Sequence, residues 1–158
     1  MLDVRPLESG DREWLERVLR EETAGPLMVS RGRLHDGLAL PGMVAMRGGK
    51  RAGALLHRVD GDELEVVFIA TTVRGVGAGA ALLVAAVELA ARERCQRAWL
   101  VTTNDNTNAI GFYQRQGWEL VALHGDAVAE SRKLKPTIPE TGNDGIPIRH
   151  ELEFERRI

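Results

Sequence analysis

Apolar residues follow strand-like spacing through much of the first half of the chain. Leu64–Ala70 is a nearly continuous apolar run, and residues 43–46 and 52–59 form two earlier runs of strand length. Gly48-Gly49 and Asp60-Gly61-Asp62 separate these runs, and short glycine-containing connections of this kind are typical of β-hairpins. We therefore predict three strands joined in an antiparallel meander.

The chain before the meander combines a strand, a helix and an irregular stretch. Residues 2–7 predict a short strand with Pro6 near its end. Residues 11–22 predict a helix, because their apolar side chains recur at helical spacing on one stripe. Residues 23–42 contain glycines and prolines outside any clear period, so we predict irregular structure. Within this stretch we interpret residues 30–33 as a solvated loop, with a site for phosphate or for an acidic ligand as the alternative.

After the meander the spacing changes, and helices alternate with strands. A long alanine- and leucine-rich helix is predicted from the end of a glycine-rich segment to about Arg94. The later predictions are a strand at 98–103, a helix at 106–116, a strand at 118–123, a short helix at 126–134, a long loop at 135–148 and a last strand at 149–155. This order indicates a mixed α/β (α+β) sheet covered by helices, in a single domain of residues 1–158.

Charge and composition exclude several classes of partner. The 158 residues carry a net charge of -2, with acidic and basic side chains mixed along the chain. This balance gives no basic patch for nucleic acid or an anionic membrane, and no apolar run is long enough to span a bilayer. Cys95 is the only cysteine, so no intramolecular disulfide is possible, and the four histidines lack metal-ligand spacing. We expect a cytoplasmic protein without a metal, a nucleic-acid partner or a membrane partner.

A glycine-rich segment joins the last strand of the meander to the long helix. Glycine lets a backbone approach a ligand closely, and the first N–H groups of a helix have no partner within it. The helix dipole favours an anion at the same end, so the position suits phosphate groups. The alternative is a turn that only packs the helix on the strand. The residues concerned are Arg74, Gly75, Val76, Gly77, Ala78, Gly79 and Ala80.

Two common phosphate-binding motifs fit this segment poorly. A P-loop needs a lysine followed by serine or threonine after its last glycine, and Ala80-Ala81 stands there instead. A dinucleotide fingerprint is nearer, since Gly75, Gly77 and Ala80 satisfy its degenerate form. That fingerprint normally opens a parallel βαβ unit, whereas this segment follows an antiparallel meander.

A third motif fits better, and a second block supports it. The spacing Arg74-x-x-Gly77-x-Gly79 resembles the acetyl-CoA pyrophosphate motif of the GNAT superfamily of N-acetyltransferases. The block Asn106-x-x-Ala109-x-x-Phe112-Tyr113-x-x-x-Gly117-Trp118 resembles another part of that family, which usually has phenylalanine after the glycine. The two blocks stand in the family's order and separation. The resemblance is clear over residues 43–123. It implies a mostly antiparallel central sheet of about seven strands with about four helices.

The resemblance also implies a reaction and roles for several residues. Acetyl-CoA would be the cosubstrate, and an amine of a small molecule or peptide would attack it directly in a ternary complex. The cofactor would lie on residues 74–80, and a backbone N–H near Ile69 would stabilise the oxyanion. Tyr113 would protonate the departing thiolate, the alternative being a core tyrosine. Glu65, which alternation places on the same face as Ile69, would be the base or else a solvated strand residue. Asn106 would cap the following helix and contact the cofactor.

The acceptor site is predicted from the C-terminal segment. The loop 135–148 is long for a compact domain, and loops of that length are usually functional or disordered. In the proposed fold the strand that follows inserts beside the strand at 98–103, close to the acetyl group. Its alternating carboxylates could hold a cationic amine there, and we single out Asn143, Asp144 and Glu151. The alternative is a frayed, solvated terminal strand.

Two other functions remain open from the sequence, namely a non-catalytic acyl-CoA-binding regulatory module and a dinucleotide-dependent oxidoreductase. A homodimer is possible.

Overall fold

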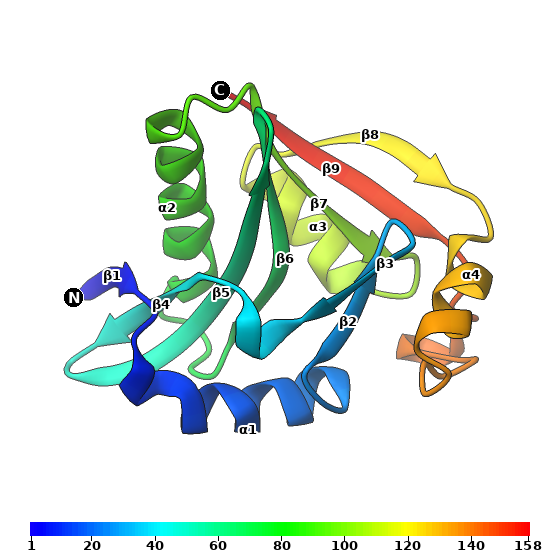
Figure 1. Cartoon of the computed structure of the whole chain (residues 1–158), viewed down its shortest axis with the longest axis horizontal. Helices are drawn as coiled ribbons and strands as arrows, with labels where there is room; N and C mark the ends of the chain where they lie inside the picture. Colours follow the sequence, from blue (N-terminus) through cyan, green and yellow to red (C-terminus); the bar gives the residue numbers. More distant parts are fainter.

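The computed structural model describes residues 1–158 and contains one seven-stranded sheet with helices on both faces (Figure 1). The strand order is β1-β4-β5-β6-β7-β9-β8, and only the β6–β7 pair is parallel. The predicted fold class, a mostly antiparallel sheet of about seven strands with four helices, is confirmed. The sheet strands are β1 (Leu2–Pro6), β4 (Gly42–Arg47), β5 (Lys50–Asp60), β6 (Glu63–Thr71), β7 (Arg97–Thr103), β8 (Glu119–His124) and β9 (Glu151–Arg157). The helices are α1 (Arg12–Thr23), α2 (Ala78–Arg92), α3 (Thr107–Arg115) and α4 (Ala127–Leu134).

Each face of the sheet has its own apolar core. On one face, side chains of α2 and α3 pack on the central strands, and Leu82, Leu100 and Phe154 are fully buried there. On the other face, α1 packs over β5 and β6 through Leu15 and Leu19. Cys95, the lone cysteine, is buried in the first core. No helix is both long enough and apolar enough to cross a membrane.

The stretch predicted to be irregular contains a β-hairpin, so that prediction was wrong. Strands β2 (Leu27–Ser30) and β3 (Arg33–Asp36) pair antiparallel as a separate two-stranded sheet. Arg31 and Gly32 form the turn with φ values of 48° and 73°. Two successive positive φ values give the tight turn that matches strand twist, and glycine supplies one of them without strain. The segment interpreted as a solvated loop is the tip of this hairpin.

Strands β6 and β7 separate after a short paired stretch. Pairing covers only Glu63–Glu65 against Arg97–Trp99. Beyond these residues β6 runs toward α2 while β7 runs toward α3, which leaves a V-shaped opening (Figure 1). β9 lies between β7 and β8, so the prediction that the last strand inserts beside residues 98–103 is confirmed.

A β-bulge in β6 changes which side chains share a face. Leu56 pairs with Phe68 and His57 with Val66, so Val67 has no partner on β5. An extra residue in one strand reverses the alternation beyond it. Val66 and Ile69 both pack toward α2, whereas Phe68 packs toward α1. The prediction that strict alternation puts Glu65 and Ile69 on one face was therefore wrong.

Candidate active site

The opening between β6 and β7 forms a cleft with a volume of about 540 Å³. Its walls come from β6, β7, the start and middle of α3, the first strand of the hairpin, and the loop after α4. The wall residues that matter below are Met28, Val29, Val66, Ile69, Thr102, Asn106, Tyr113, Lys135 and Glu151. The two halves of the sheet and the hairpin thus enclose one elongated space.

The glycine-rich segment presents a row of free backbone donors at the start of α2. None of the N–H groups of residues 74–80 donates a hydrogen bond within the protein. The first donor to find an acceptor is Ala81, whose N–H bonds the carbonyl of Gly77. Free N–H groups at a helix N-terminus attract phosphate oxygens through both hydrogen bonding and the helix dipole. This segment therefore has the geometry of an anion site, as the sequence predicted.

The glycines of this segment have two different structural roles. Gly75 and Gly77 have φ values of 75° and 79°, which favour glycine and turn the chain into the helix. Gly79 has an ordinary φ, but a Cβ there would lie 3.0 Å from Cζ of Phe112. Gly79 thus lets α2 approach α3 closely. Arg74 is exposed, with no ion pair to hold its side chain.

The backbone of Ile69 is directed into the cleft by the pairing of β5 with β6. The N–H of Thr72 bonds the carbonyl of Ala52, so these two residues form a hydrogen-bonded pair. Hydrogen-bonded and non-bonded pairs alternate in an antiparallel ladder. Ile69, three residues earlier and paired with Leu55, falls in a non-bonded pair. Its N–H consequently points toward the side from which β7 has departed.

Tyr113 lines the cleft while its ring belongs to the core. The ring lies 5.6 Å, centroid to centroid, from both Phe112 and Phe154. Burial raises the pKa of Tyr113 to about 12. The hydroxyl has no hydrogen-bond partner in the protein and is not fully enclosed. The side chain therefore combines a packed ring with a protonated hydroxyl that is free to donate into the cleft.

Asn106 lies at the N-cap position of α3, but its side chain does not cap the helix, contrary to prediction. Its amide Nδ2 donates instead to the hydroxyl of Thr102, at 3.1 Å. This contact joins the start of α3 to the end of β7. Asn106 lines the cleft, as expected of a residue near the cofactor.

Glu65 is fully buried at the point where β6 and β7 begin to separate. The hydroxyl of Ser30 donates to Glu65 Oε2 at 2.5 Å, and Arg58 Nη1 lies 3.3 Å from Glu65 Oε1. Burial raises the pKa of the Glu65 carboxyl, and the two hydrogen bonds act in the opposite direction. The interpretation of Glu65 as a solvated strand residue is excluded by its 2% exposure. Its neighbours Val66 and Val67 line the cleft, whereas the carboxylate lies just behind the wall.

The acidic residues of β9 are paired with arginines. Glu151 is buried in the cleft wall, where Arg31 donates to it from both its backbone N–H and its guanidinium, the latter at 3.1 Å. Glu153 and Glu155 share the guanidinium of Arg97. The carboxylates of β9 are therefore held in place, and the interpretation of this strand as frayed is excluded.

The structure does not bring Asn143 and Asp144 to the cleft with Glu151. Both residues are exposed in a 3-10 turn of the loop after α4. The backbone N–H of Asn143 donates to Asp105 Oδ2, which fixes the turn beside the end of β7. The same loop does reach the cleft through Thr137, Ile138 and Pro139.

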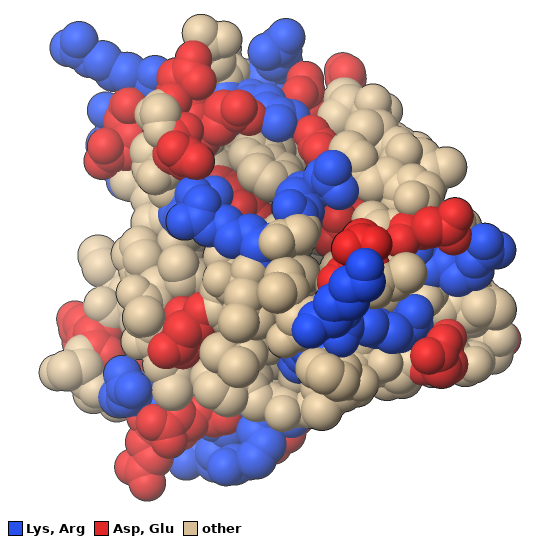
Figure 2. All heavy atoms as spheres, turned by 45° about the vertical axis from the view of Figure 1, so that its right-hand side comes forward, with Lys and Arg blue, Asp and Glu red and all other residues tan.

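The charged residues show no patch of one sign around the site. On the face that carries the hairpin and α4, basic and acidic side chains alternate over the surface (Figure 2). No group of three or more histidine, cysteine, aspartate or glutamate side chains is placed to hold a metal ion.

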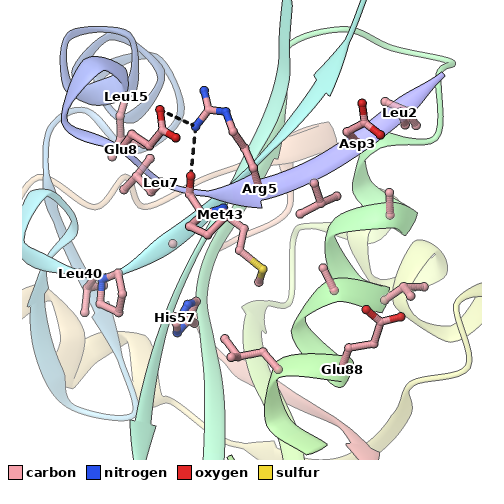
Figure 3. A pocket seen from close by; sticks show the side chains of 18 of the residues that line it. Leu2, Asp3, Arg5, Leu7, Glu8, Leu15, Leu40, Met43, His57 and Glu88 are labelled. Carbon is pink, nitrogen blue, oxygen red and sulfur yellow. Dashed lines mark hydrogen bonds and ion pairs between the residues drawn. The ribbon is translucent and has the colours of Figure 1, made fainter. Parts of the chain in front are cut away.

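A second hollow, of about 860 Å³, lies beside the edge strand β1 (Figure 3). His57 from β5 and Glu88 from α2 lie on two sides of it, and apolar residues such as Met43 line it between them. His57 Nδ1 is buried there without a hydrogen-bond partner. This hollow shares no residue with the cleft and contains none of the predicted site residues.

The fold and the cleft together define an acyl-CoA-dependent transferase. Residues 7–118 match the family model described as the acetyltransferase (GNAT) family. The match spans more than half of the chain, and the protein belongs to this family.

One relative and two solved structures are similar to this chain. The chain is 41% identical over 110 residues to the uncharacterized protein YdhI of Bacillus subtilis, covering 70% of this chain and 69% of that protein. A Bacillus subtilis acetyltransferase solved in complex with CoA has a TM-score of 0.72 at 17% identity, with 100% of this chain and 99% of the other covered. The ribosomal-protein-S18-alanine N-acetyltransferase of Escherichia coli has a TM-score of 0.69 at 17% identity, with 100% and 94% covered. These two structures share the fold of this chain.

Near Glu65, the sequence analysis missed His35 and Arg58 and interpreted Ser30 as part of a solvated loop. Ser30 and His35 lie on the hairpin that was taken for irregular structure, and Arg58 lies in the second strand of the meander. The signal for the hairpin was present, because two short runs flank an Arg31-Gly32 dipeptide with glycine at the second turn position. No local pattern indicates that this hairpin folds over Glu65, since that contact joins residues 35 positions apart.

Proposed function

We propose that this protein transfers an acetyl group from acetyl-CoA to the amine of a small molecule or peptide, by direct attack in a ternary complex. The observation that carries the proposal is a set of hydrogen-bond donors that have no partner in the protein. These are the free N–H groups of residues 74–80, which follow β6 at the start of α2, and then the N–H of Ile69 and the hydroxyl of Tyr113, two residues that line the cleft. They suit, in that order, the pyrophosphate, the thioester oxygen and the thiolate of one cosubstrate.

The chemistry follows from these positions. The amine nitrogen attacks the thioester carbonyl carbon, and the carbonyl oxygen becomes an oxyanion that the N–H of Ile69 stabilises. The tetrahedral intermediate collapses, the C–S bond breaks, and Tyr113 gives its proton to the departing thiolate. The nitrogen loses one proton, which we assign to the Glu65 carboxylate through a water at the apex of the cleft. The products are the acetamide and CoA.

Two features favour catalysis over a non-catalytic acyl-CoA-binding module. Such a module needs the donors of residues 74–80, but it has no use for a tyrosine hydroxyl left without a partner in the cleft. It also has no use for a buried carboxylate at the point where β6 and β7 separate. Membership of the acetyltransferase family argues against the dinucleotide-dependent oxidoreductase. The cytoplasmic location and the possible homodimer stay predictions.

The proposal is tested by acetyl transfer to a panel of amines. Purified protein is incubated with acetyl-CoA and one class of acceptor at a time: aromatic amines, amino acids, polyamines or peptides. Thiol release is followed, and the products are identified by mass spectrometry. At least one class should gain one acetyl group at a rate that depends on the protein. Tight acetyl-CoA binding without transfer to any class would favour the non-catalytic module. Binding of NAD in place of acetyl-CoA would favour the oxidoreductase.

A further inference from the structure

A chain of three buried polar side chains leads from the apex of the cleft to the surface of the hairpin. Ser30 Oγ lies 2.5 Å from Glu65 Oε2 and 2.7 Å from His35 Nε2. Glu65, Ser30 and His35 are 2%, 6% and 5% exposed. Three polar side chains are costly to bury unless each is hydrogen-bonded, and here they satisfy one another.

We propose that Ser30 and His35 act on the reaction through Glu65, with Ser30 as the residue that positions its carboxylate and His35 as the exit for the proton. This inference rests on the acetyl transfer proposed above. It adds to that reaction a route by which the base is regenerated after each turnover. Neither residue contacts the reacting atoms, so both are positioning residues rather than catalytic residues.

Proton movement along this chain is balanced at every atom. Glu65 takes one proton from the amine as the C–N bond forms. The neutral His35 ring must carry its proton on Nδ1 at this point, so that Nε2 can accept. The protonated carboxyl then gives its proton to Ser30 Oγ, while the Ser30 hydroxyl gives its own proton to His35 Nε2. Ser30 ends unchanged, Glu65 is again a carboxylate, and His35 becomes an imidazolium ion.

The far side of His35 is where the proton can leave. His57 Nδ1 is the only fully enclosed side-chain N or O atom without a partner, so His35 Nδ1, which also has no partner, is not fully enclosed. Burial, together with the charges of Arg58 and Arg33, lowers the pKa of His35. A neutral ring can accept a proton from Ser30, and its lowered pKa favours prompt release to water from Nδ1.

The charges that face Glu65 come from two elements. Arg58 on β5 donates to the carboxylate, and Arg33 on β3 acts at longer range, while Ser30 on β2 donates its hydroxyl. All three stabilise the carboxylate and oppose the effect of burial. Loss of the Ser30 hydroxyl should therefore raise the pKa of Glu65, whereas loss of His35 should leave it nearly unchanged.

The test compares the pH dependence of kcat in Ser30→Ala, Ser30→Thr and His35→Gln. Activity needs Glu65 as a carboxylate, so kcat rises with pH and levels off above its pKa. Ser30→Ala should move this rise to higher pH, lower kcat by up to roughly tenfold at pH values below the rise, and leave the plateau in place. Ser30→Thr keeps the hydroxyl and should restore both. The amide of His35→Gln can still hydrogen-bond to Ser30 but cannot take up a proton, so this variant should lower the plateau of kcat roughly tenfold without moving the rise.

A purely structural role for the hairpin would give a different result. Arg31→Ala removes the guanidinium contact between the hairpin and Glu151 and leaves Ser30, His35 and Glu65 unchanged. This variant is the control for a loosened hairpin. We expect it to have a lower melting temperature and a raised acceptor KM, while kcat still rises at the same pH as in wild type. If Ser30→Ala and His35→Gln behave like Arg31→Ala, or like wild type, the inference is wrong. If the wild-type protein transfers acetyl to no amine, the proposed function itself is wrong. Acetyl-CoA affinity, measured for each variant, shows that the variant is folded.

Discussion

Replacing Gly77 with aspartate should nearly abolish acetyl-CoA binding and leave the fold intact. Gly77 is the N-cap of α2 and lies in the middle of the free N–H groups of residues 74–80. An aspartate carboxylate about 4 Å from a pyrophosphate oxygen costs ~4 kcal/mol at a protein surface, which is roughly a thousandfold in Kd. The positive φ of Gly77 makes the change somewhat strained, but aspartate is among the residues that adopt positive φ, and the nearest side chain, Leu2, is 3.7 Å away. Isothermal titration calorimetry measures the loss.

A matched control separates charge at the site from strain in the backbone. Gly61 also has a positive φ and open space around it, but it lies in the turn at the opposite end of β6. Gly61→Asp makes the same chemical change and should bind acetyl-CoA with wild-type affinity. Equal affinity in the Gly77 and Gly61 variants would show that the pyrophosphate binds elsewhere.

Replacing Tyr113 with phenylalanine should lower kcat by roughly ten- to a thousandfold, within or just below the range expected for a lost proton donor. The ring packs between Phe112 and Phe154, and phenylalanine keeps these contacts. The hydroxyl has no partner in the protein, so its removal leaves no orphaned polar group and should hardly change the melting temperature. Acetyl-CoA affinity should likewise stay within about twofold, because a proton donor acts in the transition state.

The outcome for Tyr113 distinguishes its two roles. Steady-state kinetics with the best amine from the panel, together with calorimetry for acetyl-CoA, gives kcat and affinity separately. A wild-type kcat in Tyr113→Phe would show that Tyr113 is a core residue and not the proton donor. A large drop in melting temperature with kcat retained per folded molecule would lead to the same conclusion.

The cofactor side of the site could be predicted because its signals are local. A glycine-rich segment between an apolar strand and a helix already specifies where free N–H groups lie, and the structure shows them at residues 74–80. The position of Tyr113 could be predicted for a similar reason, because this residue lies on a nine-residue helix that directly follows β7. The meander, the later helices and the insertion of the last strand followed from apolar spacing and from the resemblance.

The acceptor side could not be predicted, because it depends on contacts between distant segments. The hairpin at residues 27–36 reaches Glu65 through Ser30 and Glu151 through Arg31, over separations of 35 and 120 residues. The bulge at Val67 is also invisible in the sequence, since nothing in an apolar run marks which residue will lack a partner. One extra residue was enough to reverse the predicted face of Ile69 relative to Glu65.

The most direct test of the site is the backbone amide NMR spectrum of the protein as acetyl-CoA is added. We predict that the largest shift changes fall on the N–H groups of residues 74–80 and on Ile69, and that the amides around the second hollow beside β1 barely move. CoA without the acetyl group should shift residues 74–80 but affect Ile69 much less, because it lacks the thioester oxygen. Shift changes centred on His57 and Glu88, with residues 74–80 and Ile69 unmoved, would contradict the account.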